Sequence, residues 1–126
     1  MEYKQAILIT GCDSGFGFSL ALHLAEKHQF IILACIYESE SEGAKILKSH
    51  PEIHVLKADV TNTKSIEQLK EKVDVLLEQE KAQLWTLVNN AATLVFAEAV
   101  WQTTDMVKNQ FLGMWPMSST DICLHF

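Results

Sequence analysis

Arginine is absent from the sequence: all ten basic residues are lysines, and they face 16 acidic residues. Arginine supplies the planar fork of donors that reads guanine edges and binds phosphate oxygens in pairs. Because the net charge is also −6, the composition argues against a nucleic-acid partner. No apolar stretch approaches the roughly 18 residues that would span a membrane. The short apolar run at residues 6–9 follows mixed charges and does not resemble a signal peptide.

Cysteine is scarce, and histidine shows no useful pattern. Cys12, Cys35 and Cys123 are too few and too unevenly spaced for a disulfide framework or a zinc site. The five histidines have no ligand spacing with cysteines or carboxylates, so we expect no metal site. Cys12 and Cys35 are predicted to be buried, unreactive thiols, with a reactive thiol as the alternative. This usage is typical of a reduced, soluble, cytoplasmic protein.

Strand-like and helix-like segments alternate along the 126 residues, which are enough for one domain. Hydrophobic periodicity predicts strands at 5–10, 30–36, 53–57 and 84–88, and helices at 16–27, 38–49, 64–81 and about 103–115. Alternation of this kind favours a parallel sheet with helices on both faces. Right-handed crossovers then predict an α/β, doubly wound (Rossmann) fold with strand order 3-2-1-4. We expect residues 1–115 to form this unit and 116–126 to be an irregular tail.

A glycine cluster joins the first predicted strand to the first predicted helix. Gly11, Gly15 and Gly17 have the spacing G-x-x-x-G-x-G, which differs from the dinucleotide fingerprint G-x-G-x-x-G. Glycine allows a positive φ and a close approach of backbone to a pyrophosphate, and a helix N-terminus offers N–H groups and a positive dipole end. The cluster predicts a phosphate-binding turn, with a tight turn that binds nothing as the alternative.

Two more motifs follow the third and fourth predicted strands. They are Asp59-Val60-Thr61 and Asn89-Asn90-Ala91-Ala92. With the turn T-G-C-D-S-G-F-G at 10–17, they resemble the short-chain dehydrogenase/reductase family, whose pattern is T-G-x-x-x-G-x-G, then Asp-Val, then N-N-A-G. The turn is most similar to that of the branch of retinol, hydroxysteroid and hydroxybutyrate dehydrogenases. The resemblance extends from residue 5 to about residue 115.

The resemblance implies a site for a nicotinamide dinucleotide. Its pyrophosphate and adjoining ribose would be lined by Gly11, Ser14, Gly15, Phe16 and Gly17. Its adenine amino group would donate to Asp59, with Val60 beside the ring. Its adenosine ribose would lie along Asn90, Ala91 and Ala92, the last of which replaces the family's final glycine. Two alternatives stay open: Asp59 caps the following helix, and Asn89 pins the fourth strand to its neighbours.

The residues around the second strand favour NAD over NADP. A 2′-phosphate requires Arg or Lys near the end of that strand or in the glycine turn. The strand ends Cys35-Ile36-Tyr37-Glu38, and the turn holds Asp13. In an NAD site, the position of Ile36 usually carries an acidic residue for the ribose hydroxyls; here Glu38 follows two residues later.

The family's catalytic residues have no clear counterparts. The resemblance implies a Tyr general acid/base, a Lys four residues later, a Ser that orients the substrate and a helical Asn. Neither Tyr3 nor Tyr37 has Lys four residues later, and Ser118 and Ser119 come too soon after the fourth strand. The helical Asn has only a loose counterpart in Gln110 or Asn109.

Three functional hypotheses follow. In the first, the chain is the cofactor half of an NAD-dependent oxidoreductase of an apolar, retinoid- or steroid-like alcohol or ketone, and is inactive alone. In the second, it is a truncated, non-catalytic isoform that binds a dinucleotide, or associates with itself or a full-length relative through the open edge of strand four or the last helix. In the third, it is a truncated product without function.

Overall fold

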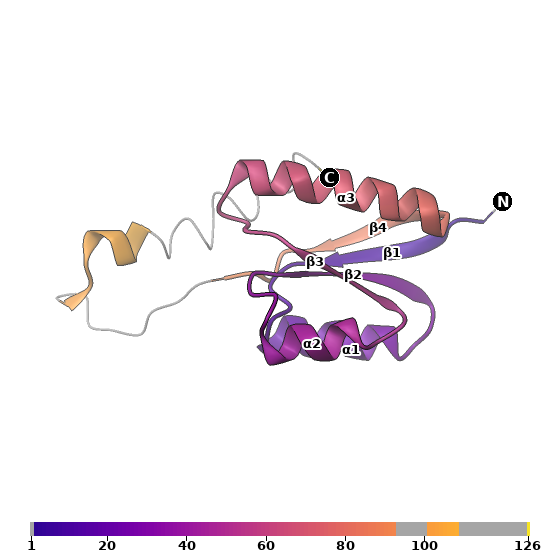
Figure 1. The fold of residues 1–126 in the computed structure, drawn as a ribbon, viewed down its shortest axis with the longest axis horizontal. Helices are drawn as coiled ribbons and strands as arrows, with labels where there is room; N and C mark the ends of the chain where they lie inside the picture. Colours follow the sequence, from indigo (N-terminus) through magenta and orange to yellow (C-terminus); the bar gives the residue numbers. More distant parts are fainter. Residues whose placement is uncertain (1, 93–100, 109–125) are drawn as a thin grey trace.

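The computed structural model describes residues 2–92, 101–108 and 126, and places a parallel sheet between two layers of helices (Figure 1). The strands are β1 Lys4–Ile9, β2 Phe30–Ile36, β3 Ile53–Lys57 and β4 Ala82–Val88. The helices are α1 Gly15–Ala25, α2 Glu42–Lys48 and α3 Thr63–Glu80. The sheet order is β3-β2-β1-β4 with every pair parallel, which confirms the predicted doubly wound α/β fold.

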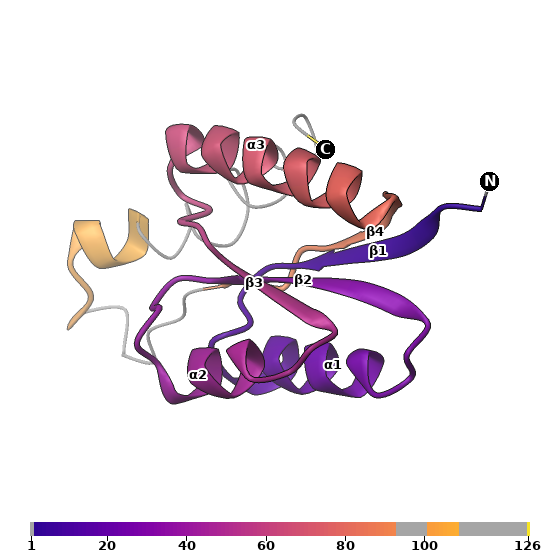
Figure 2. The ribbon, with the colours of Figure 1, turned by 45° about the vertical axis from the view of Figure 1, so that its right-hand side comes forward.

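The two central strands are buried on both faces. In β1, Ile7 and Ile9 pack toward α1 and α2, while Ala6 and Leu8 pack toward α3. Figures 1 and 2 show α1 and α2 on one side of the sheet and α3 on the other. Because both faces are covered, β1 and β2 read as continuous apolar runs instead of alternating ones. This is why β2 has the bounds that its apolar run predicted.

The apolar spacing of Phe16, Leu20, Ala21, Leu24 and Ala25 predicts the face that helix α1 turns to the sheet, and all of these except Phe16 pack there. Its buried residues are Gly17, Ala21 and Ala25, whereas the Phe16 side chain is 90% exposed. The prediction that Phe16 continues the apolar stripe is therefore wrong. Gly17 takes the sheet-facing position because a Cβ there would overlap the Gly11 carbonyl oxygen, so that no side chain fits between α1 and the glycine turn.

Helix α2 is shorter than the predicted span of 38–49, since it begins only at Glu42. Ser41 is its N-cap, and the Ser41 hydroxyl accepts a hydrogen bond of 3.1 Å from the Ala44 N–H. In the residues before it, the N–H groups of Tyr37 and Glu38 donate to the Asp13 carboxylate. The Ser41 cap marks where this helix starts.

Helix α3 is amphipathic and capped at both ends. Ile66, Leu69 and Val73 lie at helical spacing and are fully buried against the sheet. The Asn62 side chain accepts a hydrogen bond of 3.0 Å from the Ser65 N–H at the N-terminus. Lys81 ends the helix in the left-handed conformation, with φ of 50°. The prediction of 64–81 is one residue late at each end.

Strand β4 forms one edge of the sheet within the described residues. Its pairing with β1 shifts between Ala6 and Ile7, which pair with Leu84 and Thr86 and leave Trp85 as an extra residue. The Trp85 side chain is 56% exposed and stacks on Phe30, with ring centroids 5.7 Å apart. The edge predicted for strand four is therefore present in the part of the chain that the structure describes.

The remaining predicted elements differ little or fall outside the described residues. The first strand was predicted one residue late at each end and the fourth two residues short at its start. In the helix predicted at 103–115, residues 104–108 are helical and residues 109–115 lie outside the described residues. The candidates Asn109 and Gln110 also lie outside them, and so does all of the predicted tail except residue 126. No described helix combines the length and apolar character needed to cross a membrane.

Candidate functional site

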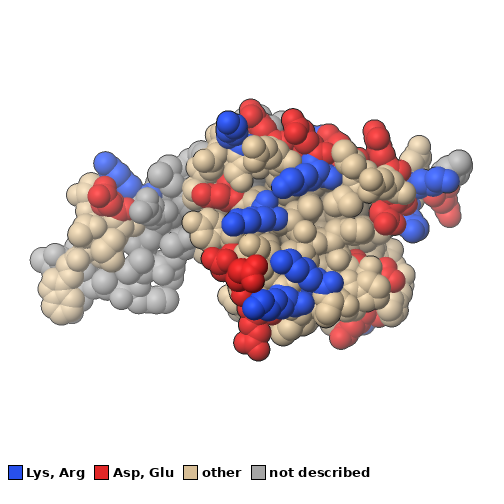
Figure 3. Space-filling model, in the orientation of Figure 1, with Lys and Arg blue, Asp and Glu red and all other residues tan. Residues whose placement is uncertain are grey.

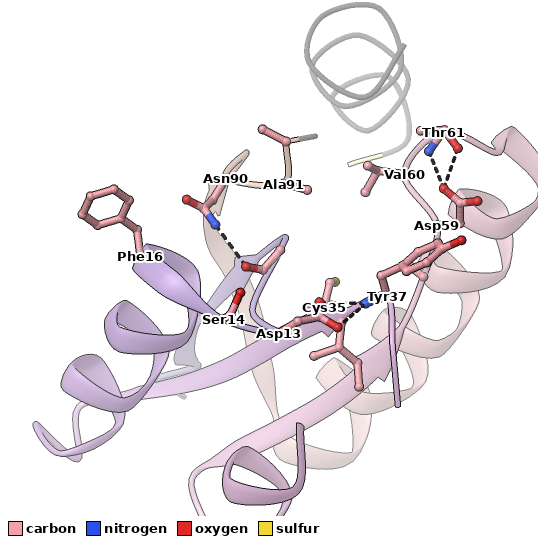
Figure 4. Close-up of a pocket in the computed structure, with 14 residues that line it drawn as sticks. Asp13, Ser14, Phe16, Cys35, Tyr37, Asp59, Val60, Thr61, Asn90 and Ala91 are labelled. Atoms are coloured by element: carbon pink, nitrogen blue, oxygen red, sulfur yellow. Dashed lines mark hydrogen bonds between the residues drawn. The ribbon is translucent and has the colours of Figure 1, made fainter. Parts of the chain in front are cut away.

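A pocket of about 610 Å³ lies at the carboxyl ends of the strands (Figure 4). Segments far apart in the sequence meet there, and its lining residues are Gly11, Asp13, Ser14, Phe16, Cys35, Ile36, Tyr37, Ala58, Asp59, Val60, Thr61, Asn90, Ala91 and Ala92. Open α/β sheets bind ligands outside the carboxyl ends of their strands, where the strand order reverses. Here the order reverses at β1, from which β2 and β4 continue in opposite directions. The size suits a small organic ligand.

Backbone geometry explains the glycines of the turn. Gly11 and Gly15 have φ of 71° and 63°, a region that costs other residues about 1–2 kcal/mol. A Cβ on Gly11 would lie 2.7 Å from Cα of Ala91. A Cβ on Gly17 would lie 2.5 Å from Nδ2 of Asn90 and would overlap the Gly11 carbonyl oxygen. The turn, the start of α1 and the end of β4 therefore touch through backbone, which only glycine permits.

Thr10 and Asn90 hold β1 and β4 together beneath the turn. The fully buried Thr10 hydroxyl oxygen accepts hydrogen bonds of 3.0 Å from the N–H groups of both Asn90 and Ala91. In return, Nδ2 of Asn90 donates to the carbonyl oxygens of Thr10 at 3.1 Å and Gly11 at 3.2 Å. Asn89, which the sequence suggested as the pinning residue, is exposed. It is the Asn90 side chain that crosses to the turn.

The N-terminus of α1 opens into this region with its first N–H groups available. Ser14 is the N-cap in extended backbone conformation, but its side chain forms no capping hydrogen bond within the described residues. The first turn of α1 carries no acidic side chain either. A helix start with uncapped N–H groups and a positive dipole end is a suitable partner for an anionic group such as a pyrophosphate.

Asp59 follows β3 and holds a tight turn. Its Oδ1 accepts hydrogen bonds from the Thr61 N–H at 2.9 Å and from the Thr61 hydroxyl at 2.6 Å. The alternative in which Asp59 caps the next helix is wrong, because Asn62 caps α3. Asp59 and Val60 are both partly buried in the pocket wall. Figure 4 shows Asp59 and Thr61 at the opposite end of the pocket from Phe16 and Asn90.

The structure brings most of the predicted site residues to one pocket. Those that line it are Gly11, Ser14, Phe16, Ile36, Asp59, Val60, Asn90, Ala91 and Ala92. Gly15 and Gly17 are not among the lining residues, since Gly17 is buried under the turn and Gly15 shapes it. Five further lining residues were not among the predicted site residues: Asp13, Cys35, Tyr37, Ala58 and Thr61. Their positions directly beside predicted ones were the available signal.

The two cysteines near the pocket have buried thiols of raised pKa. Burial, reinforced by the neighbouring Asp13 carboxylate, raises the pKa of the Cys12 thiol to about 12. Burial, reinforced by Cys12, also raises the pKa of Cys35 well above its ordinary value. Both thiols are buried and stay protonated at neutral pH, as the sequence predicted. No group of three potential metal ligands occurs among the described side chains.

The chain is similar in sequence to several dehydrogenases. The model of the family described as short chain dehydrogenase matches residues 5–115. Over 107 residues the chain is 36% identical to mouse mitochondrial D-beta-hydroxybutyrate dehydrogenase, with 82% of this chain and 31% of that protein covered. It is 41% identical over 90 residues to mouse estradiol 17-beta-dehydrogenase 2, covering 70% and 23%, and 33% identical over 100 residues to human retinol dehydrogenase 5, covering 79% and 30%.

The fold has close counterparts among solved structures. An NADPH-bound carbonyl reductase from chicken fatty liver superposes with a TM-score of 0.83 at 19% identity, covering all of this chain and 51% of that one. The chain thus spans about a third of the length of its first sequence relatives and about half of this structural one. The family match over most of the chain, with the parallel sheet and the glycine turn at its switch point, establishes that this chain belongs to the short-chain dehydrogenase family.

Proposed function

We propose that the chain binds NAD in the pocket at the carboxyl ends of the strands. The observation that carries this proposal is the glycine turn, where Gly11 and Gly17 leave room only for backbone and where α1 presents uncapped N–H groups. In this proposal the pyrophosphate lies against Gly11, Ser14 and the start of α1. The adenosine ribose follows Asn90, Ala91 and Ala92, and the adenine lies near Asp59 and Val60.

NAD is preferred over NADP in this proposal because the described residues that line the pocket are acidic or uncharged. The described lining residues include two aspartates, Asp13 and Asp59, and no lysine. Exposed glutamates follow β2 at positions 38, 40 and 42, and Figure 3 shows acidic side chains gathered near the start of α2. A 2′-phosphate would meet these carboxylates with no lysine in the described pocket wall to pair with. The chicken relative that binds NADPH shares the fold at only 19% identity.

The reaction we propose for the protein is oxidation of an alcohol or reduction of a ketone on an apolar, retinoid- or steroid-like substrate. The relatives named as estradiol and retinol dehydrogenases support this substrate class. The bound dinucleotide would supply the hydride acceptor or donor. The Tyr and Lys that the family uses for proton transfer have no counterparts in these 126 residues. We therefore expect this chain alone to bind the cofactor without turning over substrate.

Calorimetric titration with NAD tests the binding proposal. We expect Phe16→Ala, which removes an exposed aromatic ring from the pocket wall, to weaken NAD binding while the protein stays folded. The matched control is Tyr3→Ala, which removes an exposed ring that does not line this pocket and should leave NAD binding unchanged. Gly17→Glu should abolish binding by filling the turn. Equal binding heats for wild type and Gly17→Glu, both with cooperative melting, would contradict the proposed site.

A second candidate function is association between two copies of this chain along β4. It is favoured by one observation: within residues 2–92 and 101–108, β4 pairs only with β1 and carries the exposed Trp85 beside Phe30. Unpaired strand edges are templates for pairing with another chain. Light scattering after size-exclusion chromatography tests this, since a monomer over a wide concentration range would exclude such pairing. Trp85→Lys should shift a dimer toward monomer.

A further inference from the structure

The Asp13 carboxylate bridges the glycine turn and the end of β2. Its Oδ1 accepts a hydrogen bond of 2.9 Å from the Tyr37 N–H, and its Oδ2 accepts bonds of 3.1 Å from the Tyr37 N–H and 2.7 Å from the Glu38 N–H. The partners are 24 and 25 residues away in sequence. Figure 4 shows this carboxylate inside the pocket, beside Cys35 and Tyr37. Three contacts to backbone N–H groups give it one defined position.

The surrounding backbone holds Asp13 in that position. The Cys12 N–H donates to the Cys35 carbonyl oxygen at 2.9 Å, which ties the turn to β2 directly before Asp13. On the other side, α2 packs against it so closely that a Cβ on Gly43 would overlap the Asp13 carbonyl oxygen. The carboxylate is therefore oriented by backbone on two sides, and its placement does not depend on a flexible side chain.

Two neighbouring N–H groups at a strand end form a small anion site. In dinucleotide-binding folds of this kind, the region after the second strand is where the 2′ position of the adenosine ribose lies. Here the N–H groups of Tyr37 and Glu38 already bind an anion that belongs to the protein. A 2′-phosphate would lose both donors and would meet a fixed negative charge. A 2′-hydroxyl, by contrast, can donate to Asp13, since Oδ1 accepts only one hydrogen bond among the described residues.

We propose that Asp13 is the residue that selects the cofactor: its carboxylate occupies the place of a 2′-phosphate and restricts the pocket to dinucleotides with a free adenosine ribose. The acidic residue that usually performs this task sits at the end of the second strand, where this chain has Ile36. Asp13 reaches the same region from the glycine turn. This proposal rests on the proposed NAD site and adds the residue that sets its selectivity.

The test compares dissociation constants for NAD and NADP, measured by calorimetry on the full chain and two variants. Asp13→Asn keeps the shape and one acceptor but removes the charge, and Asp13→Ala also frees the two N–H groups. We expect each to narrow the preference for NAD over NADP by about tenfold or more, equivalent to about 1.4 kcal/mol. The charge-matched control, Glu40→Gln, removes an exposed acid from the same connection and should leave the preference within twofold of wild type.

Each outcome bears on one of the two proposals. A folded wild-type protein that binds neither dinucleotide overturns the NAD site itself. Wild-type protein that binds NAD with an unchanged preference in both Asp13 variants overturns the role of Asp13 and leaves the NAD site standing. Thermal melting identifies variants that fail to fold. If neither Asp13 variant folds, 2′-AMP and 5′-AMP are compared as competitors of NAD on the wild-type protein. An anion fixed at the 2′ position should make 2′-AMP the weaker competitor, so 2′-AMP binding as tightly as 5′-AMP would contradict the role of Asp13.

Discussion

Replacing Thr10 by valine removes a hydroxyl that joins β1 to the end of β4 while it preserves the shape of the side chain. The Thr10 side chain is fully buried, and its Oγ1 accepts hydrogen bonds from two N–H groups, those of Asn90 and Ala91. The Asn90 N–H keeps a second acceptor in the Val88 carbonyl oxygen at 3.1 Å. The Ala91 N–H has no other acceptor among the described residues, so the substitution leaves it unpaired.

These two losses are unequal, and their sum sets the expected magnitude. The third hydrogen bond of the hydroxyl, a long one of 3.4 Å donated to the Val88 carbonyl oxygen, adds little, because that oxygen keeps other donors. An unpaired N–H in a partly buried position costs about 1–3 kcal/mol, and we take about 1.5–2 for Ala91, because the pocket lets water approach. Loss of one of two acceptors at Asn90 adds about 0.5–1 kcal/mol. Thr10→Val should therefore lower the free energy of unfolding by about 2–3 kcal/mol. Thr10→Ser keeps the hydroxyl, loses one methyl group and should cost about 1 kcal/mol.

Urea unfolding at one pH, followed by circular dichroism, measures both variants, and an unchanged dependence on urea shows that the two-state comparison is valid. The decisive result is which of the two variants has the lower free energy of unfolding. If Thr10→Ser destabilises the protein as much as Thr10→Val, the methyl group and not the hydroxyl supports the fold. A Thr10→Val protein within about 0.5 kcal/mol of wild type would show that the hydroxyl bridge adds nothing measurable.

Three more outcomes are expected. Gly17→Ala should destabilise the protein by about 2–3 kcal/mol through overlap with the Gly11 carbonyl. Gly15→Ala should cost less, about 1–2 kcal/mol, because its Cβ meets open space and adds only backbone strain; urea midpoints rank the two. Because the thiol pKa of Cys12 is raised in the folded protein, the unfolded chain loses this proton at lower pH than the folded protein does. The free energy of unfolding should therefore fall as pH rises above 9.0, and it should fall less steeply in Cys12→Ala; melting temperatures across this pH range measure the difference. Asn62→Ala should cost about 1 kcal/mol by uncapping α3, measurable as a lower melting temperature.

Local sequence was a good guide wherever an element is buried on a whole face. The β2 run Phe30–Ile36 and the β3 run Ile53–Lys57 were predicted with their observed bounds. Helix α3 was predicted within one residue at each end, because its apolar spacing and the polar residues before it are both local signals. The strand order followed from alternation and the handedness of crossovers, which depend on no particular contact.

Local sequence was a poor guide wherever distant backbone meets the turn. Phe16 has the spacing of a core residue, but at the start of α1 it is Gly17 that packs against Gly11 and Asn90, and Phe16 is exposed. The start of α2 was placed four residues early: Ser41 caps the helix at Glu42, and the preceding N–H groups of Tyr37 and Glu38 bind the Asp13 carboxylate. Helical periodicity carries no information about either contact.

The sequence by itself determined the order of elements, the family resemblance and the identity of most residues that line the pocket, because these are encoded in short motifs and in apolar periodicity. Tertiary structure alone decided what Thr10, Asp13 and Asn90 do. Their partners lie between 24 and 81 residues away, so that only the folded sheet brings donor and acceptor within 3.2 Å. Hydrogen bonds need that proximity and direction, whereas burial needs only a pattern.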